Sequence, residues 1–463
     1  MMRRFGLIAL ALSLAACASV TAPPKPVTLG LTDADRFSAV PVGAPMPLAS
    51  DLLWWQRFDD PVLGRWVERA LANSPGIDIA RERVVQAEAL LRGARAQRSP
   101  FIGAEAVVEG RNRREPGQRA SDPSAALTLD WDLDVGGGLR QAEMSAAASV
   151  LRSADLLQAA RLSVAALTAR AYVEWQEARL DQGLLADELA LQAEVLRIVQ
   201  VRVRAGLAPQ IDLDRARSDA AAIEADAAAA SVRVRQSAAA LQVLAGERPQ
   251  VLGSVGGMAR LPELQGQQPV PRPIDLLRLR PDLRAAERSL TVAAANLGVA
   301  ESALSPRLQL PGTLALTSAG LGGGVLNIVS ASLAAVLDVA LYDGGARDAG
   351  VDLARSRVRE ASQLYRQTLL QALQQAEATL VAAEGTSRRT EALQRASTAA
   401  DAALAQARTL YTNGLTGFID VLDAQRSALN NRRNLLRARA DAARQAVTTF
   451  EVMGLIGAQA RVD

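Results

Sequence analysis

Apolar residues recur at helical spacing in two segments of the chain, residues 75–97 and 281–304. Both segments are rich in strong helix formers, and each begins with a proline, Pro75 or Pro281. Proline is favoured at the start of a helix, because its missing N–H would have no intrahelical partner there in any case. The pattern therefore predicts one helix over each segment.

After each of these segments the apolar period shortens from 3.6 residues to 2. In the first copy the alternation is clearest at 127–135, where one face carries Leu127, Leu129, Trp131, Leu133 and Val135 and the other carries Thr128, Asp130, Asp132 and Asp134. This is the pattern of a strand with one apolar and one polar face. Residues 102–108 alternate less regularly and 111–123 are polar, so the sequence predicts a hairpin over about 101–135.

The second copy predicts weaker strands over 308–317 and 333–342, within a region of about 307–342. Pro311 interrupts the first of them. Because proline cannot donate to the hydrogen-bond ladder of a sheet, we expect a bulge or an edge position at this residue.

Two segments of 66 residues without proline follow the strands, at 139–204 and 346–411. At 1.5 Å per residue each predicts a helix about 100 Å long. Gly206 and Gly414 end these helices, and the pattern predicts return helices over 212–246 and 418–453. Each return helix would measure about 50 Å, so two shorter helices stacked end to end match one long helix.

The repeated patterns reflect an internal duplication, because the chain matches itself at a shift of 206 to 208 residues. Gly136-Gly137 matches Gly344-Gly345, and Ile211-Asp212 matches Ile419-Asp420. The predicted organisation is a first copy at 61–246, an inter-repeat segment at 247–280, a second copy at 281–454 and a tail at 455–463.

The first residues have the composition of a targeting segment. Arg3 and Arg4 precede an apolar run at 7–14, and small residues lead to Cys17, the single cysteine of the chain. The pattern predicts a signal peptide over 1–16, and it resembles the bacterial lipobox, in which the cysteine becomes the acylated N-terminus. We therefore expect a lipid anchor at Cys17, followed by an N-terminal segment at 17–60. The alternative is a buried free cysteine in an ordinary secretory signal.

Composition excludes most familiar enzyme chemistry. The 463 residues include no histidine and one cysteine, which removes imidazole bases, imidazole metal ligands and intrachain disulfides. The 52 basic and 49 acidic residues leave a net charge of +3, and they are interspersed, so no nucleic-acid-binding stripe is predicted. We expect no enzyme activity, no metal and no cofactor.

The strands have the length that an outer membrane requires. About 10 tilted residues cross its apolar band, and no apolar run of 18 or more residues follows Cys17 to form a helical span. Four strands cannot close a barrel, and open sheet edges are costly in lipid. Two chains would give eight strands, with an interior filled by side chains, whereas three would give twelve and a wider lumen. A conducting function therefore favours three chains. Asp130, Asp132 and Asp134 would then face water in the lumen. The alternative is a soluble antiparallel sheet with one wet face.

The chain resembles the TolC-like outer-membrane efflux family, and within it the lipoprotein-type, NodT-like members. The resemblance covers nearly the whole mature chain. It is carried by four motifs: Trp54-Trp55-Gln56-Arg57-Phe58 with Asp60-Pro61 and Leu63, Arg280-Pro281-Asp282-Leu283-Arg284-Ala285-Ala286-Glu287, Tyr342-Asp343-Gly344-Gly345, and Ile419-Asp420-Val421-Leu422-Asp423-Ala424-Gln425-Arg426-Ser427.

The resemblance implies an α+β membrane protein that forms a homotrimer in the outer membrane. Its 12-stranded barrel would continue into a periplasmic barrel of helices, with a mixed equatorial region formed by about residues 18–60, 247–280 and 455–463. The implied function is a passive exit duct for drugs, other small toxic compounds or metal ions. The implied partners are a periplasmic adaptor and an inner-membrane pump of the RND type.

The family closes its periplasmic end where the helices turn, and by position this implies a gate at Asp420, Asp423 and Asp212. Three chains would bring Asp420 and Asp423 together as an acidic ring, which favours cations. The alternative is that these residues cap the return helices. The resemblance also implies that Tyr411 reaches the other helical hairpin. Arg426, three residues after Asp423, is positioned to pair with it.

A second class of protein shares some of these features. A lipid-anchored periplasmic coiled-coil adaptor or scaffold would also show a lipobox and long helices. It would have one helical hairpin and a separate β-rich domain, however, whereas this chain has two copies, each with its own strand pair.

Overall fold

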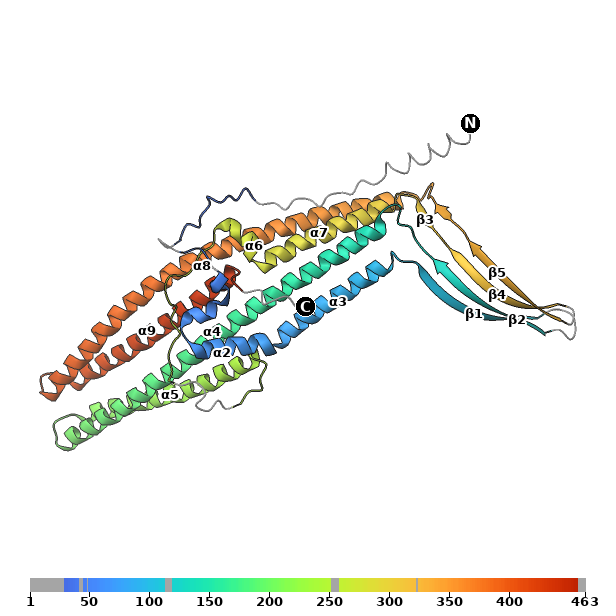
Figure 1. The fold of residues 1–463 in the computed structure, drawn as a ribbon. Coiled ribbons are helices and arrows are strands. Elements are labelled where there is room, and N and C mark those ends of the chain that lie inside the picture. The colour runs from blue at the N-terminus through green and yellow to red at the C-terminus, as the bar shows by residue number, and fades with distance from the viewer. Residues whose placement is uncertain are drawn as a thin grey trace. The chain divides into compact units, whose positions relative to one another are not determined.

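A computed structural model describes residues 29–40, 45–47, 49–112, 119–250, 258–321 and 324–456 (Figure 1). Cys17 and the predicted signal peptide lie outside the described residues. The chain divides into two compact units. The first, here the strand unit, contains Glu82–Asp155 and Arg284–Thr368; the second, the helical unit, contains Gly30–Arg81, Leu156–Leu283 and Leu369–Asp463. Each unit takes residues from both copies of the duplication.

The helices follow the order that the periodicity predicts in each copy. In the first copy α3 (Pro75–Ala96), α4 (Gly138–Arg204) and α5 (Gln210–Leu244) correspond to α7 (Pro281–Ser302), α8 (Ala346–Thr412) and α9 (Phe418–Val452) in the second. The duplicated order of helix, hairpin, long helix and helix is confirmed. Among the described residues, no helix combines the length and apolarity needed to cross a membrane.

The strand unit contains a four-stranded antiparallel sheet of order β1-β2-β4-β5. Its members are β1 (Phe101–Asn112), β2 (Arg119–Asp130), β4 (Gly312–Leu321) and β5 (Gly324–Leu333), and the two hairpins join through β2 and β4. A separate pair consists of β3 (Arg307–Gln309) and β6 (Val336–Asp338). Both hairpins are therefore present, and together they form one sheet.

Two strand predictions are wrong in their limits. The strand predicted at 127–135 is β2, which ends at Asp130. Beyond it only Asp132 forms an isolated bridge, and Asp134 adopts a left-handed φ of 51°. The strand predicted at 333–342 contains only the short β6, and the longer β5 lies at 324–333, because β5 pairs with β4 from the turn outward, starting at Leu321 and Gly324. Alternation continues past the paired region, so the pattern alone did not reveal where pairing stops.

Pro311 lies between β3 and β4 and interrupts the strand predicted over 308–317. Its carbonyl accepts a hydrogen bond from the Ala334 amide at 3.0 Å. The residue thus lies at a break in the hydrogen-bond ladder, where its missing N–H costs the sheet no hydrogen bond.

The helix α2 (Pro61–Asn73) of the helical unit was not predicted, and neither were the short η2 (Pro273–Asp275) and α6 (Leu276–Leu279). Asp60 caps α2 by accepting hydrogen bonds from the amides of Val62 and Leu63, and the same carboxylate accepts the hydroxyl of Tyr172 at 2.9 Å. The preceding 3₁₀ segment η1 (Ala49–Phe58) buries Trp54, whose ring stacks on Phe450 with centroids 5.4 Å apart. The tryptophan motif thus fixes the N-terminal segment to α9.

The two copies end in the same kind of packing. Gly246 and Gly454 follow α5 and α9 with φ near 73° and 72°. A Cβ on Gly246 would overlap the carbonyl of Asn73, and one on Gly454 would lie 2.8 Å from the carbonyl oxygen of Leu279. Each glycine therefore lets a return helix end against the backbone that precedes α3 or α7.

Candidate functional site

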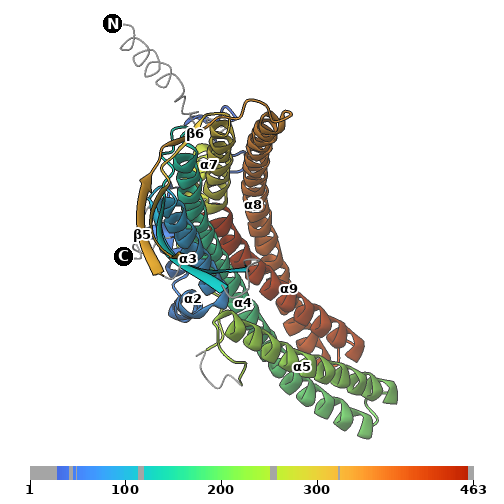
Figure 2. The same ribbon diagram turned by 90° about the vertical axis from the view of Figure 1, so that its right-hand side faces the viewer.

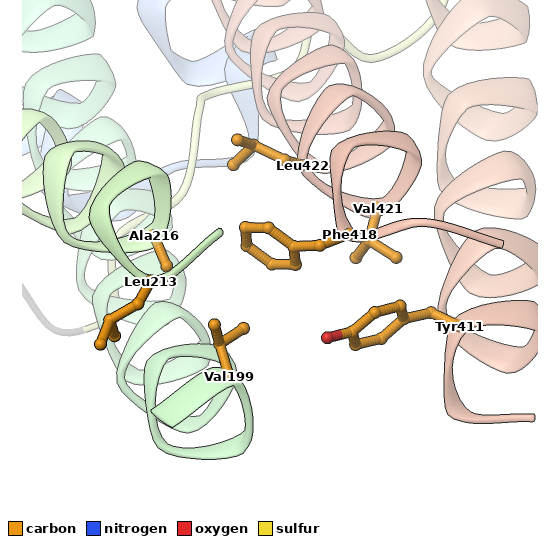
Figure 3. Close-up of a cluster of buried hydrophobic side chains, with 7 residues drawn as sticks. All are labelled: Val199, Leu213, Ala216, Tyr411, Phe418, Val421 and Leu422. Atoms are coloured by element: carbon orange, nitrogen blue, oxygen red, sulfur yellow. The ribbon is translucent and has the colours of Figure 1, made fainter. Parts of the chain in front are cut away.

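The two helical turns of the helical unit meet in one apolar cluster. In this unit α5 returns along α4 and α9 returns along α8 (Figures 1 and 2). Side chains from both hairpins are buried together beside the turns (Figure 3), namely Val199, Leu213 and Ala216 from the first and Tyr411, Phe418, Val421 and Leu422 from the second. We call these seven residues the tip cluster. It joins the two copies near the turns where the resemblance implied a gate.

Each turn is closed by the same backbone motif. Gly206 and Gly414 have φ of 72° and 74°, and the amides of Leu207 and Leu415 donate to the carbonyls of Arg202 and Leu410, both at 2.8 Å. These bonds satisfy carbonyls that the helix end leaves free. The repeated motif places the start of each return helix at an equivalent position.

Tyr411 connects the two hairpins, as the resemblance implied. The guanidinium of Arg202 lies 4.6 Å from the ring centroid of Tyr411, and its Nη1 donates to the Tyr411 carbonyl at 3.3 Å. Burial raises the pKa of Tyr411; the charge of Arg202 opposes this, and that of Asp212 adds to it. The hydroxyl is buried and has no hydrogen-bond partner among the described residues. It therefore stays protonated and packs as part of the cluster.

The predicted gate aspartates have different surroundings. Asp420 accepts hydrogen bonds from the Thr416 hydroxyl and from the Gly417 amide at 3.2 Å, and so caps α9. Asp212 forms a 3.7 Å ion pair with Arg215 within α5. Asp423 is exposed. Asp420 therefore caps a return helix, as the alternative interpretation expected. Asp420 is also exposed.

The predicted pairing of Arg426 with Asp423 is wrong. Arg426 Nε donates to Asp219 Oδ1 at 2.8 Å, and the side chain of Asp219 is largely buried on α5. Arg426 thus pairs with a carboxylate of the neighbouring hairpin and not with the exposed Asp423 on its own helix. Partial burial makes the pair with Asp219 stronger than a solvated pair would be.

Further polar contacts between the hairpins were missed by the sequence analysis. Gln425 donates to Glu188 and to Gln192, and all three are at most 3% exposed. Arg433 donates to both oxygens of Asp181 on α4, at 2.7 and 3.1 Å. The seven-residue spacing of Arg426 and Arg433 places them on one face of α9. That spacing was a usable signal, but their partners lie more than 200 residues away and only the fold identifies them.

The register of the sheet assigns each strand residue to one of two faces. Paired residues of antiparallel strands share a face. One face, here the apolar face, is mainly apolar and carries Ile102, Ala104, Leu127, Leu129, Leu314, Leu316, Val329, Ala331 and Leu333, with Ser318 and Asn327 as polar exceptions. The other, here the polar face, carries Gly103, Glu105, Ser124, Thr128, Asp130, Thr313, Thr317, Ser330 and Ser332, together with the apolar residues Phe101, Val107, Ala126, Ala315 and Ile328. Asp130 thus lies on the polar face, as predicted. Glu105 lies on it too and was missed, because alternation in the first strand is irregular.

The other two predicted lumenal aspartates lie beyond the sheet. Asp132 Oδ1 accepts the amide of Asp134 at 2.9 Å. Asp134 accepts the amides of Leu139 and Arg140, both at 2.8 Å, and so caps the start of α4. Asp343 does the same for α8 through the amides of Gly345 and Arg347. The prediction of a lumen-facing carboxylate therefore does not describe Asp134, whose oxygens are engaged by helix N–H groups.

No group of three or more potential metal ligands occurs within the part of the chain that the structure describes. The features that unite both copies are instead the tip cluster, the contacts between the hairpins and the two-faced sheet.

Comparisons with known proteins agree with this architecture. Nodulation protein T of Rhizobium leguminosarum bv. trifolii is 28% identical over 83% of this chain and 84% of its own length. Solvent efflux pump outer membrane protein SrpC of Pseudomonas putida is 28% identical over 86% of each chain. The solved structure of the outer-membrane channel OprN has a TM-score of 0.83 and 28% identity, covering 94% of this chain and 98% of that one. The family model described as outer membrane efflux protein matches residues 66–247 and 273–455. The chain therefore belongs to the outer membrane efflux protein family.

Proposed function

We propose that this protein is the passive exit duct of a tripartite export system, which three copies of the chain form together. It would carry drugs, other small toxic compounds or metal ions outward from the periplasm. The name of SrpC, a solvent efflux pump protein, supports small apolar compounds as one class of cargo. Membership of the efflux family disfavours an adaptor or scaffold.

The observation that carries this proposal is the two-faced sheet with open edges. One face is mainly apolar, and the other carries the described charged residues and most of the polar ones. Within the described residues β1 and β5 each pair with only one strand of the sheet. An edge strand in lipid leaves N–H and C=O groups unpaired, which costs several kcal/mol each. Pairing β1 of one copy with β5 of the next satisfies both edges. Three copies give twelve strands around a wet lumen.

The proposed gate lies at the turns of the helical unit. Asp420 and Asp423 are exposed and three residues apart on α9. Threefold symmetry would gather six such carboxylates at the periplasmic mouth, where they attract cations. Tyr411 on α8 and Arg426 on α9 support this mouth, since they contact Arg202 and Asp219 of the first hairpin. Asp212 adds a further carboxylate at the start of α5.

The remaining parts of the proposal concern attachment and partners. Cys17 would carry the acyl chains that anchor the N-terminal segment in the outer membrane. A periplasmic adaptor would bind the helical turns, and an inner-membrane pump of the RND type would energise export. Incorporation of labelled fatty acid into the wild type but not into Cys17→Ser, with the trimer still in the membrane through its strands, would support the anchor.

Planar bilayer recording of the detergent-extracted trimer tests the central proposal. We expect discrete channels whose conductance rises in Asp420→Asn and Asp423→Asn, with weaker block by divalent cations. Asp348→Asn, on α8 of the strand unit, serves as a charge-matched control away from the turns. A protein that stays monomeric and forms no channels would contradict the proposed duct, whereas wild-type channels with unchanged block in both variants would reject only the gate.

A further inference from the structure

The polar face of the sheet carries a charge that the proposed gate does not use. We infer that Glu105, together with Asp130, makes the strand part of the duct selective for cations. The inference rests on the proposed function, because a face can act on permeating ions only if it lines a lumen. Glu105 would be the residue that sets this selectivity.

The register places Glu105 in a row of small side chains. It pairs with Ala126 of β2, Ala126 pairs with Ala315 of β4, and Ala315 pairs with Ser330 of β5. All four residues share the polar face. Neighbours of this size cannot cover a glutamate, and the side chain of Glu105 is exposed. Its carboxylate therefore projects from the wall without shielding from its row.

The charges on the strands have one sign and lie on one face. Among the strand residues whose side chains the structure describes, the charged ones of the four-stranded sheet are Glu105 and Asp130. The apolar face has none, as a surface in contact with lipid requires. No lysine or arginine from these described strand residues offsets the two carboxylates. Each chain thus contributes two negative charges and no positive charge to this part of the wall.

The two carboxylates lie at different levels of the sheet. Asp130 pairs with Phe101, four residues before Glu105 on β1. At about 3.4 Å per residue the two levels are roughly 14 Å apart along the strand. A negative field would therefore extend over a length of the lumen instead of one ring. Asp130 lies at the end next to the helices, and Glu105 lies farther along β1.

The range of this field depends on salt, which separates it from a steric filter. The Debye length is about 30 Å at 0.01 M ionic strength and about 3 Å at 1 M. A carboxylate on the wall of a wide lumen therefore acts on passing ions in dilute solution and is screened in concentrated solution. In the proposed duct the gate carboxylates would respond in the same way, but at the periplasmic mouth.

The test is the reversal potential of single channels under a KCl gradient, with the dilute 10 mM side facing the strand end. Glu105→Gln keeps the shape and removes the charge, and we expect the cation-to-anion permeability ratio to fall roughly two-fold. Glu105→Asp keeps the charge and should retain the ratio. Ser330→Glu places a carboxylate in the same row on the same face, so in the Glu105→Gln background it should restore the ratio.

The direction of the gradient distinguishes the strand face from the gate. With the dilute side at the helical end, Glu105→Gln should change the ratio much less. A wild-type ratio in Glu105→Gln under both gradients would overturn the inference while leaving the duct intact. The inference would also be overturned if the permeability ratio fell as far in Glu105→Asp as in Glu105→Gln. If Glu105→Gln does not assemble, Ser330→Glu alone should raise the ratio, and an unchanged ratio there would also overturn it.

Discussion

The guanidinium of Arg202, in the last turn of α4, lies over the ring of Tyr411 from α8, 4.6 Å from its centroid. The same arginine donates to the Tyr411 carbonyl. A residue of the first copy thus holds a residue of the second copy by both its ring and its backbone. Because Tyr411 and Phe418 flank the second turn and belong to the tip cluster, this contact joins the two turns into one structure.

The hydroxyl and the ring of Tyr411 should have separable effects. The hydroxyl is buried without a described partner, so Tyr411→Phe should leave the thermal midpoint unchanged or slightly raised. Tyr411→Ala removes the ring from the tip cluster and should cost about 3 kcal/mol. It should also increase channel conductance, if the cluster holds the mouth closed. A large loss of stability in Tyr411→Phe would contradict this and show that the hydroxyl makes a stabilising hydrogen bond.

The carboxylates of Asp420 and Asp423 should differ in their effect on stability. Asp420 accepts the Gly417 amide at the start of α9, so Asp420→Ala should lower the free energy of unfolding by about 1 kcal/mol. Asp420→Asn retains a capping oxygen and should cost less. Asp423→Ala should be close to neutral. Thermal denaturation of the three variants checks the order, and equal losses at both positions would contradict the capping role.

Asp181 should be the most sensitive carboxylate between the two hairpins. It accepts hydrogen bonds from Arg233 and from Arg433, and it is largely buried. Asp181→Asn should cost about 2–3 kcal/mol, because it leaves two arginines facing a neutral group. The matched control is Asp401→Asn, which breaks the more exposed pair of Asp401 with Arg432 on the α8–α9 hairpin. There we expect less than about 1 kcal/mol.

The contribution of Asp181 should also depend on pH. Burial raises its pKa, but the hydrogen bonds and charges of Arg433 and Arg233 outweigh burial, so the pKa lies below its ordinary value of 3.8. A carboxylate with a lowered pKa in the folded state stabilises the protein above the pKa of the unfolded state. This stability is lost as the pH falls below about 3.8. The difference in thermal midpoint between wild type and Asp181→Asn should therefore be constant from pH 7 to 5 and shrink in more acidic solution. A difference that stays constant as the pH falls through the acidic range would indicate a packing effect.

Gly246 and Gly414 should respond differently to the same substitution. Both have φ near 73–74°, but a Cβ on Gly246 would overlap the Asn73 carbonyl, whereas nothing lies within 4 Å of one on Gly414. Gly414→Ala should cost about 1–2 kcal/mol for the left-handed backbone alone. Gly246→Ala should cost about 1–3 kcal/mol more, because backbone must move. Chemical denaturation of the two variants measures the gap, and equal costs would contradict the close approach.

The sequence determined the repeated helices because each carries its own signal. Prolines at 75 and 281, glycines at 206 and 414 and proline-free segments between them mark the ends of helices through local backbone chemistry. The four motifs also predicted the family, which the comparisons confirm. Asp130 was assigned correctly to the polar face, since alternation within a strand is a local property as well.

Tertiary structure decided which residues pair. The limits of β2 and β5 depend on where hydrogen-bonded partners end, and alternation does not report this. Asp134 carries the same side chain as Asp130 but caps α4, because the chain turns between them. Arg426 pairs with Asp219, not with Asp423, because α5 lies against α9. Such contacts join residues about 200 positions apart, and their energy comes from burial that exists only after the helices have packed.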